Sequence, residues 1–293
     1  MSITDDLKNI FTRSDNGLMR IILINIAVFL VVNIVDEIFV LKGIISPKDS
    51  VVLPWLAIPS DALPAIKHGW SFITYMFLHK EIFHILFNML WLYWLGKIFV
   101  EYAGSKRLVG VYLLGGLSGG ILFLLMSIIF PFYFEKSELL GASAGVMAVV
   151  IASAVLLPDY IIHLLFIGPV RLKYLALGAF ILTSLLDISQ NTGGKIAHIG
   201  GALLGMVFTL LYKNGRDITL PVANFLDWLL SVFSGRSKIK VSYRKKTSDD
   251  DYNQNQRAKQ AKIDLILDKI SKSGYEALTK EEKDFLFKAS GRN

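Results

Sequence analysis

The sequence predicts an all-α membrane protein, a bundle of six transmembrane helices followed by a cytoplasmic helical tail. Apolar residues make up 53% of the 293 residues and charged residues only 19%, against about a quarter charged in an ordinary soluble domain. The mean hydropathy is +0.51, which excludes a disordered chain and argues against a soluble enzyme. Six stretches nearly free of charge are long enough to cross a hydrocarbon core of about 30 Å. The absence of cysteine excludes disulfides and thiolate zinc sites.

The third and fourth predicted spans are the clearest. No charged residue lies between Arg107 and Glu135 or between Glu138 and Asp159. Residues 1–20 form a polar N-terminal segment, which we assign to the cytoplasm and which argues against a cleaved signal peptide. The six spans make up a membrane domain of residues 21–213, and they are Ile21–Val40, Ile82–Val100, Leu108–Phe130, Leu139–Leu157, Val170–Ile188 and Ile196–Tyr212.

Loop charges predict the orientation. Basic residues such as Arg20, Arg107, Lys173 and Lys213 lie at the span ends that share the side of the N-terminus. Because basic loops remain in the cytoplasm, we expect a multi-pass protein of the cell (inner) membrane with both termini cytoplasmic.

Small residues predict close packing of the spans. Glycines four residues apart let helix backbones approach each other in lipid. The pairs are Gly115 with Gly119, Gly116 with Gly120, Gly141 with Gly145, and Gly201 with Gly205.

Four polar side chains fall at one depth of this apolar body, at the outer ends of three spans. His84 and Asn88 lie one helical turn apart at the start of the second span. Ser143 lies near the start of the fourth span and His198 near the start of the sixth. Taken singly, a serine among glycines is a packing residue, a histidine at a span end is an interfacial residue, and an asparagine bonds neighbouring helices. The joint pattern favours a site.

The chemistry that this set could perform is acyl transfer. A serine hydroxyl becomes a good nucleophile when a neighbouring base takes its proton, and histidine is the usual base. Ser143 and His198 would form that pair. A carboxylate to complete a triad has no candidate, since the fourth and sixth spans contain no Asp or Glu. His84, Asn88 and the Ser143 backbone N–H could donate to a developing oxyanion.

At these residues the sequence resembles the rhomboid family of intramembrane serine proteases. The resemblance rests on H-K-E-I-F-H-I-L-F-N at 79–88, G-A-S-A-G at 141–145 and A-H-I-G-G-A-L-L-G at 197–205. It implies a six-helix rhomboid-like bundle that cleaves transmembrane segments of membrane proteins near their extracytoplasmic end. We expect such segments and the lipid bilayer as partners, and no cofactor, metal ion or nucleic acid.

The resemblance also implies a role for each matching position. Ser143 becomes the nucleophile and His198 the base. The other matches line the oxyanion hole or the substrate gate beside the fifth helix: His84, Asn88 and Gly141 for the oxyanion hole, and Phe87 for the gate. Segment Ser189–Lys195 becomes a flexible cap over the site, and the loop containing Trp70 becomes the membrane-lying loop L1.

Three positions depart from the family pattern. Ala144 stands where glycine often follows the nucleophile, and Met147 stands where an aromatic often stacks on the catalytic histidine. Ser71 follows Trp70 where arginine is common. These departures concern substrate handling, because both members of the dyad are present.

Two other functional classes remain open. A catalytically inactive relative would bind membrane clients without cleaving them, and the intact Ser143/His198 pair speaks against it. A transporter is the third class, but the predicted bundle lacks the paired charges at mid-depth that ion coupling usually requires.

Residues 214–293 form the tail, with 16 basic and 11 acidic side chains. Leu220–Phe233 suits an interfacial helix, and the basic segment Arg236–Lys246 suits anionic headgroups, within a linker region of residues 214–257. We expect the acidic and Gln/Asn-rich stretch that begins at Asp249 to be part of the linker. Residues 258–293 predict a cytoplasmic helical hairpin, broken at Gly274 and reopened by a Thr279/Glu282 capping box, that docks a possible cytoplasmic partner.

Overall fold

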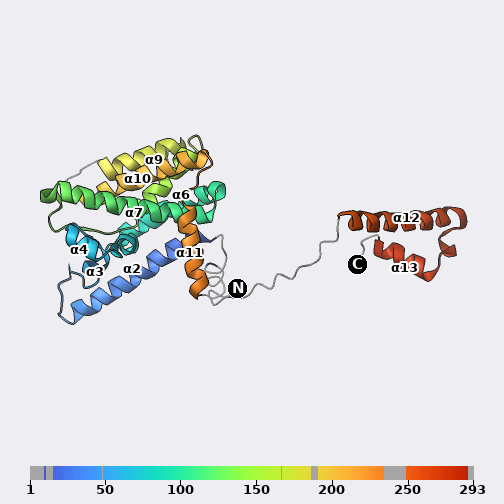
Figure 1. Cartoon of the computed structure of the whole chain (residues 1–293), viewed down its shortest axis with the longest axis horizontal. Coiled ribbons are helices and arrows are strands. Elements are labelled where there is room, and N and C mark those ends of the chain that lie inside the picture. The colour runs from blue at the N-terminus through green and yellow to red at the C-terminus, as the bar shows by residue number, and fades with distance from the viewer. Residues whose placement is uncertain are drawn as a thin grey trace. The chain divides into compact units, whose positions relative to one another are not determined.

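The computed structural model describes residues 10, 16–47, 49–165, 167–185, 191–233 and 249–289. The chain forms two compact units, Met1–Gly235 and Arg236–Asn293. The first unit is the bundle of helices coloured blue to orange in Figure 1, and the second is the pair of red helices.

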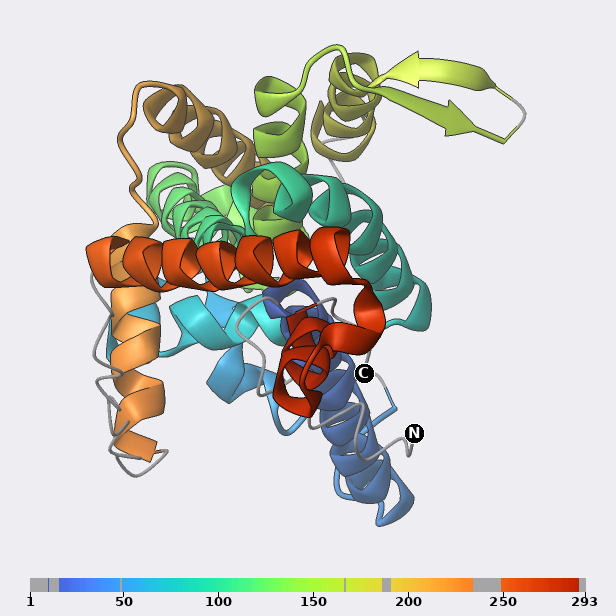
Figure 2. The same cartoon turned by 90° about the vertical axis from the view of Figure 1, so that its right-hand side faces the viewer.

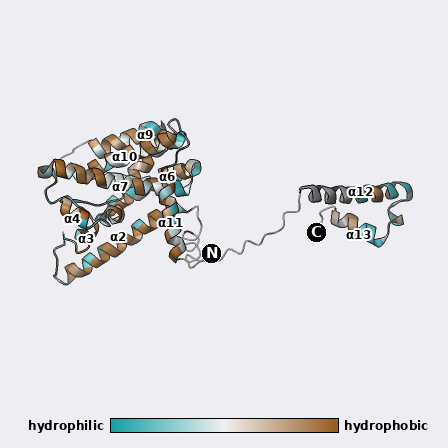
Figure 3. Cartoon of the chain, viewed as in Figure 1, coloured by the Kyte–Doolittle hydropathy of each residue, from teal (hydrophilic) through white to brown (hydrophobic). Residues whose placement is uncertain are grey.

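Four helices of the first unit are long and apolar enough to cross a membrane: α2 (Gly17–Leu41), α6 (Ile82–Ala103), α7 (Ser105–Ile129) and α10 (Thr192–Lys213). Two shorter apolar helices occupy the places of the fourth and fifth predicted spans: α8 (Ser143–Leu156), and α9 (Leu172–Phe180) with its π-helical continuation η3 (Ile181–Leu185). Figure 3 shows how apolar these helices are. The predicted all-helical membrane bundle is confirmed, and the count of six spans stays a prediction.

Helices α7, α8 and α10 pack against one another, and glycines allow α8 to approach both of its neighbours closely. These glycines form pairs four residues apart: Gly115 and Gly119 on α7, and Gly201 and Gly205 on α10. A Cβ atom added to Gly119 would lie 2.6 Å from the Cβ of Ala144. A Cβ added to Gly201 would lie 2.9 Å from the carbonyl carbon of Ala144. Helix α8 is therefore packed nearly backbone to backbone against its neighbours.

The fourth span begins later than predicted. Residues 138–139 form strand β2 (Glu138–Leu139), which pairs antiparallel with β1 (Ile58–Pro59) of the preceding loop region. Gly141 then adopts a φ of +122° and donates its N–H to the Tyr75 carbonyl at 2.9 Å. Helix α8 can start only at Ser143, so the predicted helical pair of Gly141 with Gly145 is wrong.

The fifth span also begins later than predicted, because a β-hairpin precedes it. Strands β3 (Ile161–Leu164) and β4 (Gly168–Arg171) pair antiparallel, so Val170 is a strand residue. Gly168, with φ of +88°, supplies the left-handed backbone conformation that the turn requires.

The region between α2 and α6 contains the short helices α3 (Leu53–Leu56), α4 (Ala62–Lys67), α5 (Ser71–Thr74) and η1 (Tyr75–Phe77). Helices α4 and α5 pack against α7, and α3 packs against α5. The turn η2 (Pro131–Phe134) follows α7. The ring of His68 stacks between those of Trp55 and Trp70, with centroids 5.6 and 4.9 Å away. Both tryptophans are exposed, as suits a loop that lies at a membrane interface.

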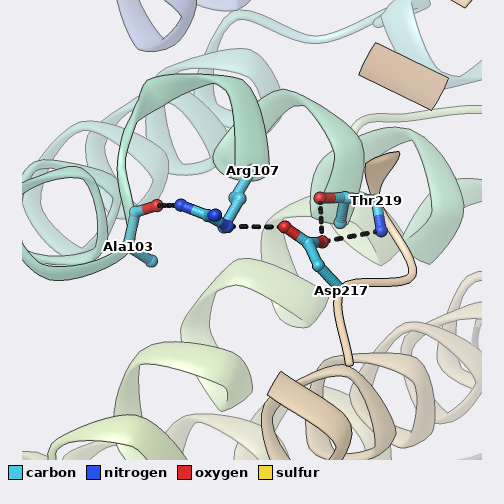
Figure 4. A network of polar contacts seen from close by, with 4 residues as sticks. All are labelled: Ala103, Arg107, Asp217 and Thr219. Carbon is cyan, nitrogen blue, oxygen red and sulfur yellow. Dashed lines mark hydrogen bonds and ion pairs between the residues drawn. The ribbon is translucent and has the colours of Figure 1, made fainter. Parts of the chain in front are cut away.

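Helix α11 (Leu220–Phe233) belongs to the first unit, where it crosses the direction of α7 at a steep angle (Figures 1 and 2). The segment before it is fixed by Asp217, whose carboxylate accepts hydrogen bonds from Arg107 Nε at 2.6 Å and from the Thr219 N–H at 2.9 Å (Figure 4). Burial raises the pKa of Asp217, but the hydrogen bonds from Thr219 and Arg107 outweigh burial and hold this pKa below its usual value. Lys106 adds an exposed ion pair to Asp227 of α11.

The second unit is a helical hairpin of α12 (Asp249–Ser273), η4 (Tyr275–Ala277) and α13 (Lys280–Ala289). The predicted capping box is confirmed: the Thr279 N–H donates to Glu282 at 2.7 Å and the Glu282 N–H donates to Thr279 Oγ1 at 3.3 Å. The linker predicted from Asp249 is wrong, because α12 begins there and acidic residues stabilise a helix N-terminus. Segment Arg236–Lys246 lies outside the described residues.

Candidate active site

Helices α6, α8, α9 with η3, and α10 surround a cavity of about 490 Å³. The sequence-predicted residues that line it are Ser143, His198, His84, Asn88 and Phe87. Predicted side chains from three helices far apart in the sequence therefore line one cavity, as their common depth predicted.

Ser143 is the first residue of α8, so its hydroxyl lies at a helix N-terminus. The preceding Gly141 explains how His84 can approach it. A Cβ added to Gly141 would lie 3.0 Å from His84 Cε1 and 3.8 Å from Ser143 Oγ. The imidazole and the hydroxyl thus flank the space that only a glycine leaves open. The positive end of the helix dipole and the free N–H groups of the first turn favour negative charge at this point.

The ring of His198 is oriented by a backbone carbonyl. Its Nδ1 lies 3.2 Å from the carbonyl oxygen of Thr183 in η3. A carbonyl oxygen can only accept, so Nδ1 carries the proton and Nε2 presents its lone pair. This is the tautomer that a general base requires. In the soluble serine proteases a carboxylate performs the same orienting task.

The side-chain amide of Asn88 is held by two neighbours. Its Nδ2 donates to the His84 carbonyl at 3.0 Å and lies 3.3 Å from Nε2 of His79. An amide has two N–H donors, so donation to an oxyanion requires that one of these contacts be exchanged. The longer contact, to His79, is the one more readily given up. His79 is itself buried, with its ring edge-on to that of His84 at 5.0 Å.

The cavity opens between α6 and α9. Phe87, which is 56% exposed, and Trp91 line it from α6, and Ala179 and Thr183 line it from α9 and η3. Phe87 therefore lies at the side of the cavity, where the resemblance implied a substrate gate.

Some groups that line the cavity or orient the site residues were not identified from the sequence. The Thr183 carbonyl carries no side-chain signal, because any residue type at that position could supply it. Glu81, a carboxylate at the N-cap of α6, also lines the cavity. His79 was visible only as the first letter of a motif. His79 lies in the loop before α6, and its contact with Asn88 brings that loop against the first turns of the helix.

The positions that depart from the family pattern are accommodated in specific ways. The methyl group of Ala144 faces Gly119 of α7, and any side chain added at position 119 would collide with this methyl group. Met147 lines the cavity and is 6% exposed. The predicted flexible cap is wrong over its described part: Asn191 is the N-cap of α10, its Oδ1 accepts from the Gly194 N–H at 3.2 Å, and helix continues from Thr192.

A family model of the rhomboid domain matches residues 67–214, which are 148 of the 293 residues. The chain belongs to the rhomboid family. It is a multi-pass membrane protein, and the matched range contains every site residue named above. A second model, described as a family of unknown function (DUF6576), matches residues 246–292.

Curated relatives match this rhomboid-family chain over a shorter range. Proteins named Rhomboid protease GlpG from Salmonella newport (strain SL254), Salmonella enteritidis PT4 (strain P125109) and Salmonella typhi are each 37% identical over 73 residues. Those residues are 25% of this chain and 26% of each relative. The chain thus matches about a quarter of the length of these proteins.

Proposed function

We propose that the chain is an intramembrane serine endopeptidase in which Ser143 and His198 act as a dyad. The observation that carries the proposal is the Thr183 carbonyl at 3.2 Å from His198 Nδ1. It leaves Nε2 free to act as a base in the cavity that also holds the Ser143 hydroxyl. A histidine that served only to pack helices would have no need of one tautomer.

The reaction would proceed by acyl transfer. His198 Nε2 takes the proton of Ser143 Oγ while Oγ bonds to the carbonyl carbon of the scissile peptide. The oxyanion that forms accepts hydrogen bonds from the Ser143 N–H and from His84 and Asn88. The C–N bond then breaks as His198 returns its proton to the departing amine, which leaves an ester on Ser143. Water, deprotonated by the same histidine, hydrolyses that ester.

The length of α8 supports a reaction below the membrane surface. Helix α8 has 14 residues and so spans about 21 Å, less than the roughly 30 Å hydrocarbon core. If its far end lies at one interface, Ser143 lies well inside the other. We infer that substrates are transmembrane segments that enter between α6 and α9 past Phe87, and that they are cut near their extracytoplasmic end.

The same proposal includes the placement of the chain in the cell (inner) membrane with both termini cytoplasmic. The basic residues at the ends of α7 and α10 support this orientation. The hairpin of α12 and α13 exposes Leu265, Leu267 and Tyr275. These side chains suit contact with a cytoplasmic partner, which we propose as the role of the second unit.

A fluorophosphonate probe tests the dyad. The wild type should be labelled and should cleave a fluorescent transmembrane substrate in lipid vesicles, whereas Ser143→Ala and His198→Ala should do neither. His163→Ala is the matched control, because this histidine lies on β3 away from the cavity, and it should behave like the wild type. Equal labelling of wild type and Ser143→Ala would refute the assignment. A wild type that binds the substrate segment without labelling or cleavage would favour the inactive relative.

A further inference from the structure

We propose that the β3–β4 hairpin is a lipid anchor that lies in the headgroup region of the bilayer, at the basic end of the bundle. The inference rests on the membrane setting of the chain and is independent of the proposed proteolysis.

The hairpin is strongly apolar, and its largest apolar side chains are exposed. Between Asp159 and Arg171 the sequence has no charged residue. Ile161 is 53% exposed, Leu165 79% and Ile167 74%. An isolated two-stranded hairpin is marginally stable in water at best, and apolar side chains grouped at an exposed tip mark an interaction surface.

Within the part of the chain that the structure describes, one face of the hairpin packs against protein. Ile162, paired with Val170, packs against the core of the bundle. On the other face Ile161 pairs with Arg171, and all four residues of the pairs Ile161/Arg171 and His163/Pro169 are exposed. The free face is therefore apolar toward the tip and charged at the base.

The unpaired edges of the two strands determine how deep in the bilayer the hairpin can lie. A two-stranded ribbon exposes unpaired N–H and C=O groups along both edges. Such groups cannot enter the hydrocarbon, where nothing satisfies them. The headgroup region supplies both apolar contact and hydrogen-bonding partners, so the ribbon fits there.

The position of the hairpin places it against lipid. It leaves the end of α8 and leads directly into α9, with the Leu172 N–H bonded to the Tyr160 carbonyl at 2.8 Å. Lys213, at the end of α10, donates to the Val155 carbonyl, so both lie at the same end of the bundle. Figure 2 shows the hairpin extending sideways from the first unit. Because lipid surrounds spanning helices, an arm that leaves sideways at their ends lies along the membrane surface.

The charges at the base complement phospholipid headgroups. Arg171 and Lys173 both contact Asp159, at 3.2 and 2.8 Å, and all three side chains are at least partly exposed. Two cations facing one carboxylate leave a net positive charge, which attracts anionic lipid phosphates. Tyr174, 59% exposed beside Lys173, has the character of a membrane-interface aromatic. This charge complementarity favours lipid over a protein strand or a second copy of the chain.

The absence of native cysteine makes the test direct. A nitroxide attached to Leu165→Cys in the full chain, reconstituted in phosphatidylcholine/phosphatidylglycerol vesicles, reports collisions with oxygen, which concentrates in lipid, and with a water-soluble nickel complex. Val31→Cys on α2, 61% exposed, provides the lipid reference. Gln260→Cys on α12, an exposed position, provides the water reference.

The oxygen-to-nickel collision ratio at position 165 should exceed that at position 260 several-fold and fall below that at position 31. Adding Ile167→Asp should lower the ratio at 165, because a charged tip leaves the interface. A ratio at 165 equal to that at 260 would overturn the proposal. So would spin–spin broadening between labels at 165, which would identify a second copy as the occupant.

Discussion

Replacing Gly201 by alanine should separate the two members of the proposed dyad without touching either. Gly201 lies three residues after His198 on α10, and it faces the backbone of Ala144, the residue after Ser143. An added methyl group would meet the Ala144 carbonyl oxygen well inside van der Waals contact, and would lie 2.9 Å from the carbonyl carbon and 3.2 Å from Cα. Because all of these atoms belong to backbone, no side chain can rotate away.

The expected loss in rate follows from the distance by which α8 and α10 must separate. Ordinary contacts of a Cβ atom begin near 3.4 Å, so α8 and α10 must separate by roughly 1 Å, a misplacement that costs about 100-fold in rate when it reaches reacting groups. That factor corresponds to about 2.7 kcal/mol of transition-state stabilisation. Overpacking should also lower the free energy of unfolding by about 1–3 kcal/mol.

Turnover of a fluorescent transmembrane substrate, measured beside the rate of fluorophosphonate labelling, checks the prediction. Gly178→Ala on α9 is the matched control, because a Cβ there would have nothing within 4 Å, and it should retain wild-type turnover. Thermal unfolding identifies the folded fraction of each variant. A folded Gly201→Ala protein with full turnover would refute the reasoning that close packing of α8 against α10 sets the dyad geometry.

Three further predictions concern the oxyanion donors, the docking of α11 and the tail. Alanine at His84 or Asn88 should lower kcat roughly 100- to 1,000-fold with little change in KM, and the losses in the double variant should be sub-additive; a raised KM alone would mark a docking group. The pKa of Asp217 is held low in the folded chain, so its stabilisation of α11 docking is present above its unfolded pKa and is lost as the pH falls through its folded pKa. Asp217→Asn should remove this dependence in hydrogen exchange of α11, and an unchanged acid profile would contradict it. A chain ending at Gly235 should keep turnover within roughly tenfold, about 1.4 kcal/mol, unless the second unit shapes the site.

The spans could be predicted wherever the signal was local. The charge-free run after Arg107 specifies α7 by length alone. The predicted fifth span wrongly included Val170 and Arg171, which belong to β4, because a short apolar run fits a strand as well as a helix. The start of α8 depends on β2 pairing with β1, a contact between segments far apart in the sequence.

The residues of the candidate site could be predicted because the chemistry of Ser143, His84 and His198 stands out against an apolar background. What orients them could not be predicted. The hydrogen bond from His198 uses a main-chain oxygen of Thr183, and the position of that oxygen follows from the π-helical end of α9. The sequence carries no pattern of residue types from which backbone geometry of this kind could be predicted.

The use of a peptide carbonyl to orient His198 has a kinetic consequence. In the proposed reaction the imidazole becomes a cation when it takes the proton of Ser143, and a carbonyl dipole would stabilise that cation less than a full negative charge would. In a soluble serine protease the orienting carboxylate both fixes the tautomer and stabilises the imidazolium, whereas a carbonyl supplies the first effect and only part of the second. In the proposed protease, a slower chemical step would let a bound segment unwind and refold many times before it is cut. Selection among substrates would then reflect how often each segment unwinds.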